Sequence, residues 1–285
     1  MSYKNRWLIT ASLILFVSVI GLIYYYFYIH NIQIPYTVSH KFKVREIYPT
    51  KQQGREWFIN MDDPISDKIF DPGNKITREA DGSWQIKGRQ TNEKYEDQVR
   101  MNVKTPNSQP EWKNVEITGY AKVLLSHSPI DHLAWYARGG RHSSEVPCEG
   151  TSLKGRINVD GKVSWIKEIW HTGGYTDPID VHKVTHSILG RWIGWKVVIY
   201  NMRSDKAVKM ESYLDDTDTN HWLKVANVID DGRWYAKESD KVFYSADCGR
   251  PKNYIITNSG PIVTYRSDNM MWDFKDLSVR EIQPP

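Results

Sequence analysis

The sequence predicts an all-β domain, an antiparallel β-sandwich of two sheets, preceded by one N-terminal transmembrane helix. Three observations lead to this fold class. A long uncharged segment stands near the N-terminus, apolar and polar residues alternate in many short segments after it, and no later segment shows a convincing helical period. About ten to fourteen strands at this spacing suggest a two-sheet sandwich or jelly roll.

The first element is the uncharged run WLITASLILFVSVIGLIYYYFYI, residues 7–29. About 20 apolar residues suffice to cross a bilayer, so this run is long enough to span one. Lys4 and Arg6 precede it, and basic residues favour a cytoplasmic N-terminus, which leaves residues 1–6 inside the cell. A cleaved signal peptide is the alternative, but the run is long for one and no small-x-small cleavage pattern follows it. We therefore expect a single-pass protein of the cell membrane that contacts the lipid bilayer through residues 7–29, with its C-terminal domain extracellular.

The rest of the chain divides into a stalk and a domain. Residues 30–54 are polar and basic without a clear period, which indicates a stalk. Residues 55–285 are enough for one large domain or two small ones, and we assign them to one extracellular sandwich. The phrase Val-Arg-Glu-Ile occurs at residues 44–47 and again at 279–282. This is either chance or a sign that the first and last strands pair, since chain ends often lie close together.

Three segments show the two-residue period of half-buried antiparallel strands most clearly. Residues 114–125 (NVEITGYAKVLL), 152–159 and 208–215 place small or apolar side chains on one face and polar ones on the other. Turn signals such as Asp160-Gly161 separate further strands. These are predicted at residues 97–103, 131–138, 162–171, 191–201, 222–229 and 271–282.

Three of these segments follow one another in a characteristic order. A Trp-led strand, GRWIGWKVVIYN at residues 190–201, precedes a strand with an acidic turn at 208–216, and WDFKDLSVREI closes the chain at 272–282. This order resembles the concanavalin A-like lectin and glucanase (LamG-type) jelly-roll family. Residues 54–64 and 138–156 are also similar to segments of secreted or membrane-anchored archaeal proteins of this type. The resemblance implies the fold but says little about activity, because lectins, hydrolases, lyases and adhesion modules share it.

The chain has two cysteines, Cys148 and Cys248. An extracellular domain lies in an oxidising compartment, where disulfides form and persist. A bridge between the two is the economical interpretation, and two unrelated buried thiols are the alternative. The loop at residues 138–150 is then first of all a stapled connection, from which Arg141 and His142 are free to face solvent or the rim of a groove.

Polar and aromatic side chains on the predicted strands suggest a glycan-binding surface. Carbohydrate sites pair aromatic rings with charged side chains that bond hydroxyl or carboxylate groups, and arginine offers two parallel hydrogen bonds. A merely solvated strand face is the alternative. The candidates from the strand faces and the stapled loop are Tyr120, Arg138, Arg141, His142, Lys154, Arg156, Glu211 and Tyr213.

The strand predicted at residues 162–171 adds further candidates. Its two faces each carry a charge among bulky residues, Lys167 on one and Glu168 on the other. Such charges are rarely buried without a partner, so we expect the strand to be covered on both sides, by core and by a groove or long loop. A structural ion pair is the alternative. The candidates here are Trp165, Lys167, Glu168 and His171.

Catalysis has weaker support than binding. Glu211 and Asp215 lie about 13 Å apart at 3.3 Å per strand residue, beyond the roughly 5 to 9.5 Å of glycosidase carboxylates. We therefore expect a membrane-anchored protein that binds a glycan or another surface ligand without evident catalysis. The alternatives are a structural module of the cell envelope and a polysaccharide lyase, which needs a base and a cation beside a uronate. For the lyase the available groups are Arg138, Arg141, His142, His171 and Tyr175.

Composition and motifs argue against nucleic acid and give little support to metals. The 38 basic and 34 acidic residues leave a formal charge of only +4, without a long basic run, so nucleic acid is not an expected partner. Residues 215–221 (DDTDTNH) begin like a calcium loop but lack its glycine and its final glutamate. Asp216, Asp218 and Asn220 are weak calcium ligands on this pattern, and no other cofactor is predicted.

Overall fold

A computed structural model describes residues 44–88, 98–106, 109–202 and 204–285. The predicted cytoplasmic residues 1–6, the anchor at 7–29 and the first part of the stalk lie outside the described residues. Within the described ranges, no helix is both long and apolar enough to cross a membrane. All the described residues belong to one structural unit, His40–Pro285.

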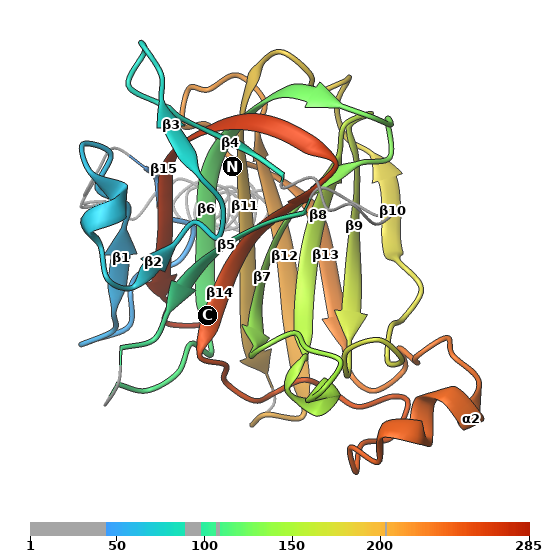
Figure 1. Ribbon diagram of the computed structural model, residues 1–285. Helices are drawn as coiled ribbons and strands as arrows, with labels where there is room; N and C mark the ends of the chain where they lie inside the picture. Colours follow the sequence, from blue (N-terminus) through green and yellow to red (C-terminus); the bar gives the residue numbers. More distant parts are fainter. Residues whose placement is uncertain (1–43, 89–97, 107–108, 203) are drawn as a thin grey trace, which may run out of the picture. The chain divides into compact units, whose positions relative to one another are not determined.

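Two antiparallel sheets pack face to face across an apolar core (Figure 1). The larger, eight-stranded sheet has the order β13-β12-β11-β6-β15-β4-β3, and β1 pairs with β15. Its strands are β1 (Glu56–Phe58), β3 (Ile76–Arg78), β4 (Trp84–Lys87), β6 (Val115–Ser126), β11 (Trp192–Met202), β12 (Ala207–Asp215), β13 (Leu223–Asp230) and β15 (Met270–Glu281).

The second, seven-stranded sheet has the order β10-β9-β8-β7-β14-β5-β2. Its strands are β2 (Phe70–Asp71), β5 (Gln98–Lys104), β7 (His132–Gly139), β8 (Ser152–Asn158), β9 (Lys162–Glu168), β10 (Ile179–Lys183) and β14 (Ile262–Asp268). In the described part of the chain, four short helical turns join the strands: η2 (Pro64–Ser66), η3 (Pro147–Glu149), α2 (Asp240–Phe243) and η4 (Tyr244–Ala246).

This arrangement confirms the predicted all-β, two-sheet antiparallel sandwich, and it is the architecture that the concanavalin A-like resemblance implies. Every segment predicted as a strand contains one. The strands that the sequence did not reveal are mostly short ones near the sheet edges, such as β2 and β10. The exception is β14, a central strand of seven residues whose alternating sequence, IVTYRSD, carries a strand signal.

Tryptophan side chains from both sheets fill the middle of the core. Trp135 of β7 and Trp195 of β11 are fully buried, and the indole nitrogen of Trp135 donates to the Trp195 carbonyl oxygen at 2.9 Å. Trp135 also contacts Tyr265 of β14 edge to face, with 5.0 Å between ring centroids. These side chains occupy the inward positions of their strands, so the residues on either side of them in the sequence point outward.

The outer face of the eight-stranded sheet is covered by residues 44–54, which the sequence analysis assigned to the stalk. Glu116 of β6 forms buried ion pairs with Lys196 of β11 and Arg280 of β15, and Arg280 also pairs with Glu46 at 2.9 Å. The two Val-Arg-Glu-Ile copies therefore meet through Glu46 and Arg280, and a bridge between Thr50 and Ile282 continues the contact. Residues 44–54 pack on this face because their apolar side chains join its apolar cluster and because Glu46 brings a carboxylate to the buried Arg280.

The predicted disulfide is confirmed. Cys148, in η3, is bonded to Cys248, just after η4, with 5.4 Å between the Cα atoms. The bridge closes a loop of 100 residues and ties the connection after β7 to the segment that follows α2. The loop at residues 138–150 is thus a stapled connection, as expected.

Replacing Cys148 with serine should lower the free energy of unfolding by about 2–5 kcal/mol, because the bridge restricts the unfolded chain. Urea unfolding under non-reducing conditions measures the change. The double variant Cys148→Ser/Cys248→Ser is the control, since it removes the unpaired thiol and should lose the same amount. A wild-type chain that unfolds at the same urea concentration with and without reductant would contradict the prediction.

Candidate functional site

Basic and polar side chains form two rows across the outer face of the seven-stranded sheet. Directly paired residues of antiparallel strands place their side chains on the same face, so the register gives the order of each row. The first row is Arg100, Arg266, Ala134, Arg156 and Ser164, from β5 to β9. The second row, two residues along each strand, is Asn102, Thr264, Tyr136, Lys154 and Ile166.

We call Arg100, Tyr136, Lys154, Arg156 and Arg266 the cationic face. Tyr136 and Lys154 are 3% and 4% exposed and form its floor, whereas the three arginines are half-buried. The face has this character because inward positions of the same strands are apolar, such as Val99 and Met101 of β5. Four cations thus lie within a few strand spacings of one another, each spacing being about 4.8 Å.

Two of these cations lack an acidic partner among the described residues. Arg266 pairs with Asp268 at 2.8 Å, and Lys154 pairs with Glu168. Arg156 instead donates to the Ser164 hydroxyl at 2.9 and 3.1 Å, and the buried Nε of Arg100 has no hydrogen-bond partner. Burial and the nearby Arg266 lower the pKa of Arg156 to about 10, which still leaves it charged at neutral pH.

A second cluster, centred on Glu168 at the end of β9, adjoins the cationic face. Glu168 is fully buried, and its Oε2 accepts from the Ser152 hydroxyl at 3.0 Å and from Lys154. Its Oε1 accepts from the Tyr175 hydroxyl at 2.6 Å and lies 2.9 Å from Nδ1 of His171. Burial favours the neutral acid, but Lys154 and these hydrogen bonds outweigh it and hold the pKa of Glu168 well below its usual value.

Two loops bring histidines to this cluster. His142 comes from the stapled loop and His171 from the turn after β9, and their rings stack with 5.3 Å between centroids. The opposite face of His142 stacks on Tyr136, so three rings lie in one pile. The loops approach closely at Gly150, where a Cβ would lie 2.5 Å from Cβ of His171. Any larger residue at position 150 would push the two loops apart.

The cluster has the composition of a metal site but is arranged as an ion pair. The ligand atoms of His142, Glu168 and His171 all lie within 4.8 Å of one another, a set of two histidines and one carboxylate. However, the carboxylate already accepts from Lys154 and other donors, and the two rings lie only 12° from parallel. Lone pairs in nearly parallel rings do not converge on one ion unless a ring turns. The geometry therefore favours a carboxylate held by an ammonium group.

The sequence-predicted candidates fall in different places. Lys154, Arg156 and Glu168 lie on the outer face of the seven-stranded sheet, and His142 and His171 join them from loops. Arg141 is on the surface, its guanidinium 3.6 Å from the Glu149 carboxylate.

Arg138, Trp165 and Lys167 lie inside the molecule. Lys167 and its partner Asp230 are buried, with 2.8 Å between the ammonium nitrogen and the carboxylate oxygen. Lys167 is thus part of a structural ion pair, the alternative that the sequence left open. Both faces of β9 are covered, as expected. Arg138 has a left-handed φ of 67° and donates to the carbonyl oxygens of Lys113 and Ile256. Burial lowers its pKa to about 9. These side chains hold the fold together and do not reach the cationic face.

The remaining aromatic candidates lie on the other sheet. Tyr120 donates to Asp215 at 3.0 Å, and Tyr213 donates to Glu211 at 2.8 Å. Glu211 also accepts from Tyr48 of the covering segment. Tyr120, Glu211 and Tyr213 are therefore separated from the cationic face by the full thickness of the sandwich.

The three residues of the weak calcium pattern, Asp216, Asp218 and Asn220, each interact with other groups of the protein. Asp216 pairs with Arg191 and Asp218 with Lys275, each at 2.7 Å. The Asn220 side-chain oxygen accepts from the backbone N–H of Arg45 at 2.7 Å. The three oxygens serve separate partners, as in an acidic turn.

Sequence reasoning missed Arg100, Tyr136 and Arg266 of the cationic face. Arg100 and Tyr136 stand at outward positions of predicted strands, and Arg266 stands at an outward position of β14. The alternation of inward and outward positions within each strand was thus enough to predict that these three side chains point outward. What the sequence lacked was the register that makes them neighbours.

No family model matches the chain, and a search of curated proteins finds no match. Among solved structures, the carbohydrate recognition domain of Emp46p has a TM-score of 0.47 and 8% identity over 80% of this chain and 97% of its own. Lectin I from Ulex europaeus has a TM-score of 0.45 and 8% identity, covering 80% and 98% of the two chains. Alginate lyase A1-II' has a TM-score of 0.40 and 12% identity, covering 77% and 85%.

The buried histidines make stability depend on pH. Burial lowers the pKa of His142 from 6.5 to about 3 and that of His132 to about 4. The unfolded chain therefore binds more protons than the folded one below about pH 6.5, and stability falls as pH decreases from there, by up to about 1.4 kcal/mol per pH unit for each histidine. The lowered pKa of Glu168 adds to the loss at more acidic pH.

Urea unfolding between about pH 7 and pH 4 measures this slope. The variant His142→Gln should flatten it, and the variant His186→Gln, at an exposed loop position, should leave it unchanged. Equal slopes in wild type and His142→Gln would show that His142 does not have the lowered pKa.

Proposed function

We propose that this domain binds an acidic glycan across the cationic face. The observation that carries the proposal is the pair Arg100 and Arg156, half-buried arginines that form no ion pair with a described carboxylate, Asp268 acting on Arg156 only from a greater distance. Partly desolvated charges without an opposite charge are unfavourable. A ligand carboxylate or sulfate removes this cost, because a guanidinium binds such groups through two parallel hydrogen bonds.

The direction of the arginine row across the strands indicates how the proposed ligand lies on the face. Arg100 and Arg266 stand on neighbouring strands, and Arg156 is two strands further, so the guanidiniums span about 14 Å across the strands. Half-buried polar groups lie on one side of the row, Asn102 at the β5 end and His171 beside Glu168 at the β9 end. These supply hydrogen bonds to sugar hydroxyls. The buried Lys154–Glu168 pair lies beneath and keeps the floor in place.

A second candidate is elimination within an acidic polysaccharide, favoured by His171 and Tyr175 beside the arginines. In this reaction a base removes the proton next to the uronate carboxylate, an arginine stabilises the resulting charge, and an acid protonates the leaving glycosidic oxygen. His171 has a 20% exposed side chain and is the available base. Burial and Glu168 raise the pKa of Tyr175, so it keeps its proton and is the available acid. The products are an unsaturated uronate and a new chain end.

We also propose that residues 7–29 anchor the domain on the outer side of the cell membrane. The apolar run is long enough to span a bilayer. The disulfide between Cys148 and Cys248 supports an oxidising compartment for the domain.

Replacing Arg156 with glutamine should weaken binding to a polyuronate by about 1.5–3 kcal/mol, the contribution of a charged hydrogen bond. The melting temperature should change little, because among the described residues the guanidinium donates hydrogen bonds only to the Ser164 hydroxyl. Calorimetric titration measures the binding. The variant Arg233→Gln is the matched control, since it loses the same charge at an 85% exposed position. Equal binding by wild type and Arg156→Gln would refute the proposed site, and growth of ultraviolet absorbance during incubation would identify elimination.

The full chain should remain in the membrane fraction after carbonate washing, because an apolar span is not released by high pH. A chain limited to residues 40–285 should be soluble, since that range is one structural unit. Fractionation followed by immunoblotting measures both. Release of the intact full chain into the supernatant would refute the anchor.

A further inference from the structure

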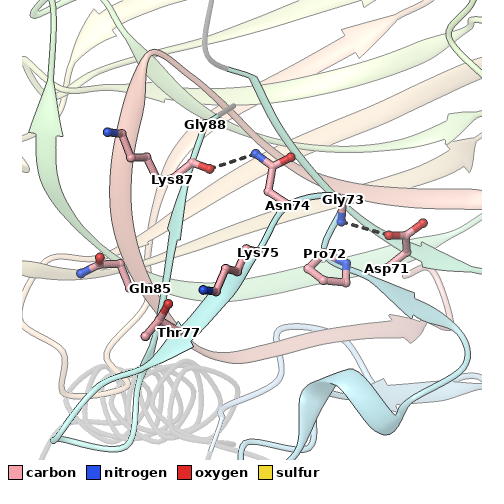
Figure 2. A pocket seen from close by; sticks show the side chains of 9 residues that line it. All are labelled: Asp71, Pro72, Gly73, Asn74, Lys75, Thr77, Gln85, Lys87 and Gly88. Atoms are coloured by element: carbon pink, nitrogen blue, oxygen red, sulfur yellow. Dashed lines mark hydrogen bonds between the residues drawn. The ribbon is translucent and has the colours of Figure 1, made fainter. Parts of the chain in front are cut away.

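A polar pocket of about 510 Å³ lies between the β3–β4 hairpin and the loop after β2 (Figure 2). Lys75, Thr77, Gln85 and Lys87 line it from the hairpin. Ile76 pairs with Ile86 and both are buried, so the residues on either side of them, which include these four, point away from the core. One face of a short hairpin therefore gathers two ammonium groups, a hydroxyl and an amide.

The charges of this pocket favour an anion. Lys75 and Lys87 are exposed, and neither pairs with a carboxylate of the described residues. The acid in the lining, Asp71, is already paired with Lys104 at 2.7 Å and also accepts from the backbone N–H of Gly73. Among the described residues no acid therefore neutralises the two lysines, and Thr77 adds a hydrogen-bonding group.

The pocket is built against the strand that carries Arg100. Asn74 donates to the carbonyl oxygens of Lys87 at 2.9 Å and Gln98 at 3.2 Å, which ties β4 to the start of β5. Gly73, with a left-handed φ of 69°, packs so closely that a Cβ there would lie 2.7 Å from the Arg100 carbonyl oxygen. The pocket wall at Gly73 therefore packs against the backbone of Arg100, the arginine at the β5 end of the row. The pocket thus adjoins the start of β5, at the end of the row that Arg100 occupies.

We propose that this pocket is a second subsite for the ligand of the cationic face, and that the ligand is a polyanionic chain. The inference rests on the proposed function. Arg156, Arg266 and Arg100 take acidic groups along the row, and Lys75 and Lys87 take the carboxylate or sulfate of a unit further along the chain. An acidic monosaccharide cannot occupy the whole row and the pocket together, because the row alone spans about 14 Å.

The test compares ligand length. The full chain in detergent is titrated with a galacturonic acid disaccharide, with long oligomers of galacturonic acid, and with short and long sulfated oligosaccharides. Wild type should bind the long oligomers more tightly than the short ones. The variant Lys75→Gln/Lys87→Gln should bind the long oligomers about tenfold more weakly and the short ones as wild type does. A loss of affinity of this variant for the long oligomers of either series supports the subsite. The series that binds, uronate or sulfated, identifies the anion.

The control Lys183→Gln/Lys241→Gln removes the same charge from exposed positions on β10 and α2. Equal weakening in this control, or no weakening in Lys75→Gln/Lys87→Gln while Arg156→Gln still loses affinity, would overturn the subsite and leave the proposed function standing. Unchanged binding of every oligomer by Arg156→Gln would overturn the proposed function itself. Melting temperatures of the two lysine double variants should match wild type, because the replaced lysines are exposed.

Discussion

The buried carboxylate of Glu168 is the interaction on which the candidate site depends. It receives Lys154 and Ser152 from β8, and His171 and Tyr175 from the turn after β9. Removing one partner of such a buried pair typically costs about 3–5 kcal/mol, because the other charge is left uncompensated. The cost explains why two loops and two strands keep one arrangement here. The disulfide holds the loop of His142 from its far end. These contacts hold Lys154 and Glu168 in the floor of the cationic face.

The two outer faces of the sandwich treat their charges differently. On the eight-stranded sheet, Lys196 and Arg280 are buried and are neutralised by Glu116 and by Glu46 of the covering segment. On the seven-stranded sheet, Arg100 and Arg156 have no such partner among the described residues. Both faces carry cations because outward strand positions are ordinarily polar. The difference is that described acids pair with both cations of the first face, whereas on the second face they pair with Arg266 and Lys154 but not with Arg100 or Arg156.

The strands and the disulfide could be predicted because their signals are local. Alternation reveals a strand without knowledge of its partners, and two cysteines in an oxidising compartment leave one pairing. The cationic face could not be predicted, because Arg100 and Arg266 become neighbours only through the register of β5 and β14. Arg138 shows the other limit. It shares the outward parity of Tyr136, but a left-handed φ of 67° at a shift in register turns it inward, where carbonyl oxygens receive it.

The covering segment, residues 44–54, also closes one of the two outer faces. Val44 and Tyr48 pack with Tyr200 and Trp222 on the eight-stranded sheet, so the aromatic side chains of that face are used within the fold. Aromatic rings are common sugar contacts, and Tyr120 and Tyr213 were candidates for that reason. Their hydroxyls are instead bound to Asp215 and Glu211. Binding there would require the covering segment to leave and the Glu46–Arg280 pair to break. The binding proposed for the seven-stranded face needs no such rearrangement, because residues 44–54 pack on the other sheet and leave its half-buried arginines uncovered.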